Sequence, residues 1–414
     1  MSNSILQRYP ALGFPRYRRY WLASFASVGA TQLITLGQGW LIFELSGSAL
    51  TLGFLGAAAA LPNIMMTLIG GVVADRFDKR RIMMFTSLAI TALLLLLAGL
   101  DYTGLVAVWH VLAVAGCISL INGLDWPVRV SIYTSLIDRS AFLSAVALNS
   151  FIWQATRMAI PAFGGLIIAL WDTAAVFAIG AAGFFAMFVV MATLEVAPTA
   201  TTEHSPWQQL TEGMRFILHS ELFKWLLALT FVGMFFSASY IQVMPIFADL
   251  MNVGETGYGY LLSAGGIGSV LGTLLVGGIN KYRRLGTLML GSAVATAIAV
   301  IAFAMTADAG LFVAGLSITL IASLMSSVFM ITSMTVLQLA VPDALRGRVM
   351  GIHTIGYSLM SLGGLFIGAL AEVLDAGMAV LLGNLIYLSF IILIWFRRPN
   401  IRRLDGQALE TRVE

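Results

Sequence analysis

The chain has 414 residues, of which 59% are hydrophobic and only 10% are charged, and its formal net charge is +3. A soluble protein with so few charged side chains could not cover its surface, because the average soluble protein carries roughly 25%. The composition excludes a disordered chain and a collagen, and it favours a helical protein that crosses a membrane many times.

Twelve apolar stretches are long enough to cross a bilayer core, which takes about 20 residues of helix. The first six cover residues 20–45, 50–74, 82–100, 105–128, 141–170 and 173–194. After a polar stretch, the other six cover residues 224–249, 256–280, 286–306, 311–339, 347–373 and 376–397. The first stretch is too long for the core of a signal peptide, so we interpret it as a membrane span.

The spans divide the chain into five segments. We predict an all-α membrane protein with a cytoplasmic N-terminal segment at 1–19, a six-helix bundle at 20–194, a cytoplasmic linker at 195–222, a second six-helix bundle at 223–397 and a cytoplasmic tail at 398–414. Span 2 with its following loop, residues 50–81, is weakly similar to span 8 with its loop, residues 255–284, which indicates an internal duplication. Parallel six-span repeats are an architecture of transporters.

The distribution of charge predicts the orientation. Of the 23 lysines and arginines, 22 lie in the terminal segments and alternate loops that would face one side of the membrane. The opposite loops carry only acids: Glu44, Asp101, Asp172, Asp249, Glu255, Asp308, Glu372 and Asp375. Because cytoplasmic loops are rich in basic residues, we expect both termini in the cytoplasm. The net charge then reflects topology, and no nucleic-acid partner is expected.

Sequence patterns of enzymes and metal sites are absent. The single cysteine, Cys117, cannot form an internal disulfide. The sequence has no clustered Cys/His pattern, no Gly-x-Ser-x-Gly and no P-loop, so direct use of ATP is not expected. We predict neither an enzyme nor a bound cofactor or metal, but a monomer in the lipid bilayer whose partners are a small-molecule substrate and protons.

The loop between spans 2 and 3 resembles the signature loop of the major facilitator superfamily, Gly-x-x-x-Asp-Arg-x-Gly-Arg-Arg. In this chain it reads Gly71-Val72-Val73-Ala74-Asp75-Arg76-Phe77-Asp78-Lys79-Arg80-Arg81, with Asp78 in place of the second glycine. Residues 40–48, 149–165 and 341–351 are similar to the drug and siderophore exporter group, which includes enterobactin and macrolide exporters. The span count and the repeat extend the resemblance to the whole chain.

The resemblance implies two pseudo-symmetric bundles and secondary active transport by alternating access. We expect export of a small amphipathic compound, drug or siderophore-like, across the bacterial inner membrane by proton antiport. An importer or uniporter on the same fold is the alternative. A membrane sensor or scaffold is a third interpretation, against which the lack of a sizeable soluble segment argues.

The resemblance also implies a cytoplasmic gate around the signature loop. Its expected members are Gly71, Asp75, Arg76, Lys79, Arg80, Asp125, Arg346 and Arg348. In the superfamily the aspartate that matches Asp75 faces the start of span 11, and Lys79 and Asp125 would complete the charge cluster. The alternative interpretation is a loop of solvated charges that only sets the topology.

Span 5 carries part of the antiporter motif Gly-x-x-x-Gly-Pro-x-x-Gly-Gly. Pro161, Gly164 and Gly165 match it, whereas Thr156 and Ile160 occupy the two earlier glycine positions. This departure weakens the inference of antiport.

Arg157 is the one basic residue inside a span, near the expected bilayer centre. An arginine there costs at least roughly 2.5–3.5 kcal/mol, so it must face the protein interior or water. It could bind an anionic or carbonyl-rich substrate, take part in proton coupling, or be held structurally by nearby amides.

Other polar and aromatic residues within the spans complete the candidates for substrate binding or coupling. With Arg157 they are Asn149, Gln154, Asn63, Asn122, Trp40, Trp153, Tyr240, Gln242 and Gln338. Such amides equally serve as hydrogen bonds between helices. No acid falls at the centre of a span, and His110 and His353 could titrate near neutral pH or make structural hydrogen bonds, so no proton carrier is assigned.

Overall fold

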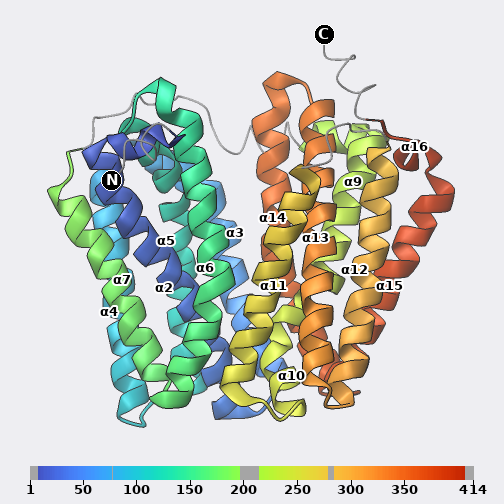
Figure 1. Cartoon of the computed structure of the whole chain (residues 1–414), viewed down its shortest axis with the longest axis horizontal. Helices are drawn as coiled ribbons and strands as arrows, with labels where there is room; N and C mark the ends of the chain where they lie inside the picture. Colours follow the sequence, from blue (N-terminus) through green and yellow to red (C-terminus); the bar gives the residue numbers. More distant parts are fainter. Residues whose placement is uncertain (1–7, 77, 196–213, 278–283, 406–414) are drawn as a thin grey trace. The chain divides into compact units, whose positions relative to one another are not determined.

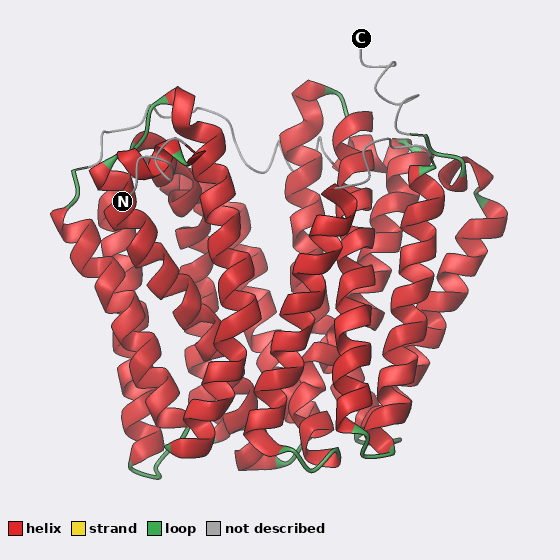
Figure 2. Ribbon diagram, viewed as in Figure 1, coloured by secondary structure: helices red, strands yellow, loops and turns green. Residues whose placement is uncertain are grey.

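A computed structural model describes residues 8–76, 78–195, 214–277 and 284–405, with the side chains of all of these except 67–76, Thr134, Asp343 and Ala344. Helices dominate the described residues, and no strand occurs among them (Figure 2). Long apolar stretches favour helices in a membrane because a helix satisfies its backbone hydrogen bonds internally.

The first half of the chain forms six long helices (Figure 1). They are α2 (Pro15–Ser46), α3 (Ala49–Arg76), α4 (Lys79–Tyr102), α5 (Val108–Ser135), α6 (Phe142–Leu170) and α7 (Thr173–Thr193). Two short 3₁₀ turns accompany them, η1 (Pro10–Gly13) before α2 and η2 (Arg139–Ala141) before α6. Each predicted span of this half falls on one of the six helices.

The second half contains six further spans, the first of which is broken. It consists of α9 (Glu221–Val232), a π turn η3 (Gly233–Ser237), a 3₁₀ turn η4 (Ala238–Val243) and α10 (Met244–Leu250). The others are α11 (Gly254–Gly277), α12 (Leu285–Asp308), α13 (Phe312–Ala340), α14 (Asp343–Ala371) and α15 (Ala376–Arg397), and a short α16 (Pro399–Arg402) comes after them.

Eleven of these spans are long and apolar enough to cross a membrane by themselves within the described residues. The twelfth is α2, a helix of 32 residues that begins with an arginine-rich turn and contains the predicted first span. The prediction of an all-α membrane protein with twelve transmembrane helices in two six-helix bundles is therefore confirmed.

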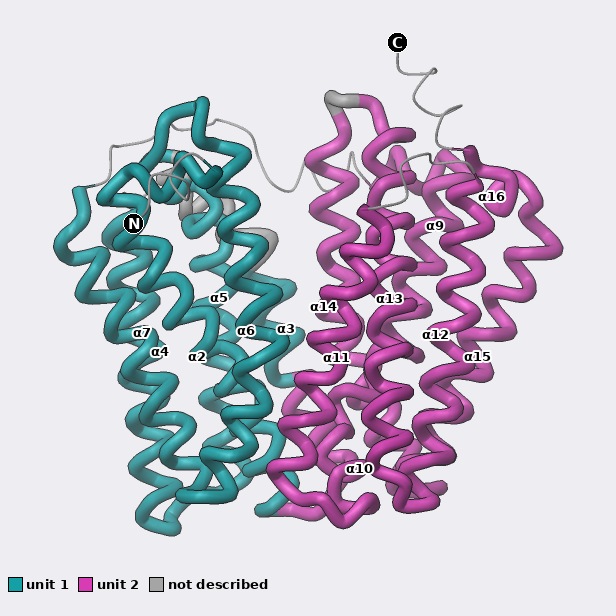
Figure 3. The backbone as a smooth tube through the Cα atoms, viewed as in Figure 1, with its two compact units in different colours: residues 1–45, 58–206 teal, residues 46–57, 207–414 magenta. Residues whose placement is uncertain are grey.

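The chain forms two compact units (Figure 3). Unit 1 comprises residues 1–45 and 58–206, and unit 2 comprises residues 46–57 and 207–414. The first turns of α3 thus belong to unit 2, where they pack closely on α14. A Cβ atom on Gly53 would lie 2.7 Å from the Leu365 Cα atom, and one on Gly368 would lie 2.3 Å from the Ala49 carbonyl oxygen. Because glycine has no Cβ atom, these positions let the two helix backbones approach more closely than any other residue would allow.

Each unit has its own apolar core. In unit 1 the turn η1 and the start of α2 bury Tyr17 and Tyr20 against α4, α5, α6 and α7, and the Tyr17 hydroxyl donates to the Ala145 carbonyl at 3.2 Å. In unit 2 the core joins α9, α12, α13, α14 and α15 around side chains such as Leu226, Met289 and Tyr387. These cores hold the polar groups of each unit in place.

The two units begin their last span in the same way. Asp172 caps α7 by accepting from the Ala175 N–H at 2.9 Å, and Asp375 caps α15 by accepting from the Met378 N–H at 2.6 Å. A carboxylate at this position satisfies helix N–H groups that have no partner inside the helix. The shared cap agrees with the internal duplication.

Candidate functional site

The signature loop connects α3, which ends at Arg76, to α4, which begins at Lys79. Asp78, which replaces the second glycine of the motif, caps α4, since its side chain accepts from the N–H groups of Arg80 at 2.9 Å and Arg81 at 3.4 Å. The side chains of Gly71, Asp75 and Arg76 lie outside the described ones, so their part in a gate stays a prediction. Lys79 is half-buried in the first turn of α4.

Arg80 binds the end of another helix. Its Nε donates to the Met191 carbonyl at 2.9 Å, and its Nη2 donates to the Ala192 carbonyl at 2.6 Å, both in the last turn of α7. A cation at a helix C-terminus satisfies free carbonyls and opposes the negative end of the helix dipole. This residue of the signature loop therefore ties α4 to α7 inside unit 1.

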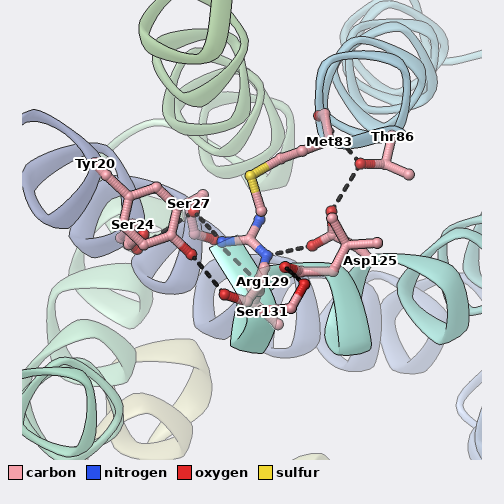
Figure 4. A network of polar contacts seen from close by, with 10 residues as sticks. Tyr20, Ser24, Ser27, Met83, Thr86, Asp125, Arg129 and Ser131 are labelled. Atoms are coloured by element: carbon pink, nitrogen blue, oxygen red, sulfur yellow. Dashed lines mark hydrogen bonds and ion pairs between the residues drawn. The ribbon is translucent and has the colours of Figure 1, made fainter. Parts of the chain in front are cut away.

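Asp125 lies at the centre of a buried polar network near the end of α5 (Figure 4). Its carboxylate, 3% exposed, forms an ion pair with Arg129 one turn later on α5 and accepts a hydrogen bond from the Thr86 hydroxyl of α4 at 2.7 Å. Arg129 in turn donates from Nη1 to the Ser27 hydroxyl of α2 at 3.0 Å. The network connects α2, α4 and α5.

The surroundings explain how this pair is tolerated in an apolar bundle. The Tyr20 hydroxyl donates to the Arg129 carbonyl at 3.3 Å, and the Arg129 side chain is only 12% exposed. Burying an isolated charge is costly, but a paired charge with further hydrogen bonds is compensated. Moving α2 or α4 away from α5 would break the hydrogen bonds that Ser27 and Thr86 make to these buried charged groups, so the network can hold the three helices in one arrangement.

The basic residues predicted for the gate in span 11 lie at the start of α14. Arg346 and Arg348 are half-buried, and Gly347 between them is exposed. They belong to unit 2, while Asp125 and Arg80 belong to unit 1. Within unit 1, the structure brings Asp125 together with Arg129, a residue that was not among the predicted gate members.

Arg157 lies on an exposed face of α6 in unit 1. One turn before it, Trp153 contacts Trp126 of α5 edge to face, with 5.5 Å between the ring centroids, and Trp126 is 50% exposed. Because a guanidinium at membrane depth is costly in lipid, we expect this face of α6 to contact water or other protein groups. The surface formed by Trp126, Trp153 and Arg157 is called the tryptophan–arginine face below.

Four predicted amides of unit 1 are half-buried: Asn149, Gln154, Asn63 and Asn122. Asn149 and Gln154 lie on α6 with the tryptophan–arginine face, whereas Asn63 lies on α3 and Asn122 on α5. Trp40 is buried within α2, and its ring lies 5.7 Å from that of Phe43.

In unit 2, Tyr240 and Gln242 lie in η4, the 3₁₀ part of the broken span. Tyr240 is buried with its ring 5.5 Å from that of Phe303, and the Gln242 amide donates to the Ser361 hydroxyl of α14 at 3.2 Å. Gln338 is exposed near the end of α13. Gln242 thus links helices, as intramembrane amides often do.

The antiporter-like residues lie where α6 packs on α2. Pro161 is inside the continuous helix, and Gly164 and Gly165 are buried, with Leu33 and Leu36 of α2 against Gly164. Thr156 and Ile160, which replace the two motif glycines, lie against Gly29 of α2. At the level of Thr156 and Ile160, the glycine between the two helices is therefore Gly29 of α2, whereas the antiporter motif has its glycines on the helix that corresponds to α6.

The residues that sequence reasoning missed are Arg129, Trp126, Thr86 and Ser27. The predicted span 4 ends at residue 128, whereas α5 continues to Ser135, so Arg129 was placed in a loop. The Asp125–Arg129 spacing of four residues on one helix is a signal that could have identified the pair. Trp126, Thr86 and Ser27 have no such signal. Within the described residues, no three His, Cys, Asp or Glu side chains form a group that could hold a metal.

Comparison with known proteins identifies relatives over the whole length. The family described as transmembrane secretion effector, of the major facilitator type, matches residues 9–413. The enterobactin exporter EntS of Escherichia coli strain K12 is 25% identical over 429 residues, with 98% of both chains covered. The enterobactin exporter of Shigella flexneri is 24% identical over 427 residues, again with 98% of both chains covered.

Solved structures share the fold. A nucleoside transporter, NupG, has a TM-score of 0.74 at 14% identity, with 93% of this chain and 99% of that chain covered. A D-xylose–proton symporter has a TM-score of 0.69 at 14% identity, with 94% and 99% covered. Similarity at this level of identity concerns the arrangement of the helices alone.

Proposed function

Because the chain belongs to the transmembrane secretion effector family of the major facilitator superfamily, and is therefore a membrane transporter, we propose that it exports a small amphipathic compound of the siderophore or drug type. In this proposal it works across the bacterial inner membrane by alternating access, in exchange for protons, with both termini in the cytoplasm. The observation that carries the proposal is its similarity to enterobactin exporters over 98% of both chains.

The tryptophan–arginine face supports the choice of substrate class. Trp126 and Trp153 offer flat apolar surfaces, and Arg157 offers a fork of N–H donors beside them. Aromatic rings of a ligand stack on indole, and a guanidinium binds anionic or carbonyl oxygens in two places at once. A compound with rings and clustered oxygens, such as a siderophore, matches both features.

The buried network supports a structural role during gating. Asp125, Arg129 and Thr86 join α4 and α5, and Arg80 joins α4 to α7, so these helices of unit 1 are held together where the signature loop begins. A transporter that alternates between two states needs bundles that stay intact while the path opens and closes. We assign this network the task of keeping unit 1 intact.

The test is transport by the purified full-length protein in lipid vesicles. Protein inserted with its cytoplasmic side outward should take up enterobactin into vesicles with an acidic interior, and a protonophore should abolish the uptake. Uptake that ignores the proton gradient would indicate a uniporter, and uptake only in the opposite orientation would indicate an importer. No transport of enterobactin, a macrolide or ethidium in either orientation would contradict the proposal.

Arg157→Ala tests the substrate face in the same assay. We expect a large rise in the enterobactin concentration needed for half-maximal transport, because the anionic or carbonyl oxygens lose their donor. Arg139→Ala, an exposed arginine of η2, is the matched control and should behave as wild type. Equal transport by both variants would remove Arg157 from the site.

A further inference from the structure

A buried histidine in unit 2 has no part in the function described above. His353 of α14 is 4% exposed, and its Nε2 atom has no hydrogen-bond partner among the described residues. Leaving a buried polar nitrogen without a partner is costly, because the group loses its hydrogen bonds to water on folding, so such a group in a native protein calls for an explanation. Imidazole is also the side chain whose charge ordinarily changes near neutral pH.

His353 lies deep in its span. It is ten residues after the first residue of α14, which corresponds to about 15 Å of helix. Gly356, on the same face one turn later, is covered by Phe231 of α9 and Met234 of η3. Its neighbour Ile352 belongs to the apolar core of unit 2. The imidazole is therefore enclosed by apolar side chains next to the broken span.

The broken span also carries polar atoms that face α14 further along this helix, about 15 Å beyond His353 at Gly363. Met234 lies in the π turn η3, where the regular helical ladder of hydrogen bonds changes to a different spacing. The Phe235 carbonyl oxygen points at α14, where a Cβ atom on Gly363 would lie 2.0 Å away. The hydroxyl oxygens of Ser237 and Ser239 are buried and, among the described residues, have no hydrogen-bond partner.

Few other ionisable groups lie on the elements packed against α14. They are Glu221 and Lys224 in the first turn of α9, Tyr240 of η4, and Tyr387 and Arg397 of α15. Residues 46–57, η3 and α13 contribute none, and α14 itself carries Asp343, Arg346, Arg348 and Tyr357. No carboxylate lies at the depth of His353 on these elements. Asp125 of unit 1 is already engaged by Arg129 and Thr86.

We propose that His353 is the group that carries the coupling proton during transport; this rests on the proton antiport proposed above. The neutral ring suits its apolar surroundings. When Nε2 takes a proton from water, the imidazolium becomes a double donor that needs oxygen acceptors and water. The broken span packs beside this part of α14 and carries oxygen acceptors about three turns further along it, so protonation is tied to a rearrangement at η3 and η4 that brings acceptors or water to the ring, and release of the proton to water restores the neutral ring.

The decisive measurement uses the wild-type protein without any need for transport. The chain has four histidines, so full-length protein in lipid nanodiscs with ring-labelled histidine gives a tractable NMR spectrum. We expect the His353 ring to change protonation state within the range of about pH 5 to 8 in which histidine ordinarily titrates, and enterobactin to shift its midpoint. By linkage, a shift of about one pH unit corresponds to a roughly tenfold difference in enterobactin affinity between the two protonation states.

A His353 ring that keeps the spectrum of one protonation state over this pH range, with and without enterobactin, overturns the proposal. This outcome is independent of the proposed function. If His353 titrates but the protein transports nothing, the proton antiport proposed above is wrong. The role of His353 as proton carrier is then wrong as well. A midpoint that enterobactin leaves unchanged also overturns the coupling.

A transport assay in lipid vesicles provides the second test of the proposal. His353→Gln in vesicles should retain exchange of enterobactin down its own gradient and lose the acceleration by a pH gradient. His110→Gln is the matched control: His110 lies at the start of α5, where its Nδ1 accepts from the Ala107 N–H at 3.0 Å, and its loss should leave the acceleration intact. If His353→Gln keeps the wild-type response to the pH gradient, His353 is not the carrier.

Discussion

The two units share a plan but join their helices by different chemistry. Asp172 and Asp375 cap the last span of each unit in the same way. Inside unit 1, however, α2, α4 and α5 are tied by the charged network around Asp125. Unit 2 ties α9 to α13 by a bond between two hydroxyls, Thr230 and Ser333, at 3.1 Å.

The internal repeat allows the two units to be compared span by span. The span of unit 2 that corresponds to α5 is α13, and its 29 residues include no Asp, Glu, Lys or Arg. Unit 2 therefore lacks the charges and has a broken first span, whereas α2 of unit 1 is continuous. The comparison teaches that the two units share their helix caps but differ in their joints: unit 1 has a buried ion pair, and unit 2 has a broken first span.

The largest expected effect comes from breaking the charged joint of unit 1. Asp125→Leu leaves the Arg129 guanidinium buried without its partner, which costs about 3–5 kcal/mol. Thr230→Val in unit 2 removes two hydrogen bonds between neutral groups, to the Leu226 carbonyl and the Ser333 hydroxyl, and should cost about 1–2 kcal/mol. Chemical denaturation of the purified variants measures both free energies of unfolding.

The double variant Asp125→Leu/Arg129→Met is the control for this prediction. Removing both charges should recover most of the lost stability, because no unpaired charge remains. Equal losses for Asp125→Leu and Thr230→Val would mean that the two units are joined with equal strength, and the contrast drawn above would be wrong.

The next effect concerns the close approach of α14 to the broken span. In Gly363→Ala the added methyl would meet the Phe235 carbonyl oxygen and backbone, and overpacking of this kind costs about 1–3 kcal/mol. Gly351→Ala on the same helix meets nothing within 4 Å, so the gain in helix propensity should stabilise it by up to about 1 kcal/mol. Thermal unfolding midpoints compare the two; a higher midpoint for both variants would place α14 further from η3 than described.

A smaller effect separates two adjacent arginines of the signature loop. Arg80→Gln removes two hydrogen bonds to the last turn of α7 and should cost about 1.5 kcal/mol, the lower end for bonds to a charged group. Arg81→Gln affects an exposed side chain beside Asp78 and should cost less than about 0.5 kcal/mol. Chemical denaturation measures the free energy of unfolding of both variants. Transport by Arg81→Gln then shows whether Arg81 affects gating without affecting stability.

The smallest expected effect is a dependence of the stability of the fold on pH, which arises from Glu372 of unit 2. The Ser48 hydroxyl, which donates at 2.5 Å, and the Leu50 N–H, which donates at 3.3 Å, lower the pKa of Glu372 below its ordinary value. A lowered pKa stabilises the fold above the ordinary glutamate pKa, and this contribution disappears as the pH falls through the lower folded value. Because Glu372 is exposed, the contribution is small.

Glu372→Gln provides the comparison. The wild type should unfold at a slightly higher temperature than this variant above the ordinary glutamate pKa, and the difference should disappear as the pH falls through the lower pKa of the folded state. A difference that grows on acidification would have the wrong sign for a lowered pKa and would contradict the contact with Ser48 and Leu50.

The fold was predictable because the bilayer demands long apolar helices, and hydropathy reports them directly. The broken span was not, since residues 224–249 have the same apolar composition as a straight helix and the change of hydrogen-bond spacing leaves no compositional trace. Span ends were missed for a related reason: Arg129 is charged and so indicates a loop, but its pairing with Asp125 lets α5 continue past it.

The candidate site was predictable only in part. Arg157 stands out in the sequence because a charge in an apolar run is costly, whereas Trp126 is one of nine tryptophans and gains meaning only from its contact with Trp153. His353 was visible as a titratable residue within a span, but its unpartnered Nε2 depends on which side chains surround it. Such surroundings arise from packing between segments far apart in the chain.

The π turn at Gly233–Ser237 has a consequence for how this chain tolerates changes in length. A turn closed by bonds from residue i to i+5 holds one residue more than a turn of α-helix, so it has the form of a single-residue insertion. Deleting one residue within it would return the span to regular register and rotate the residues before the deletion by about 100° relative to the residues after it. Tyr240 and Gln242 would then keep their order in the chain but lose their neighbours on α12 and α14, which makes the extra residue a determinant of where the second half of the span points.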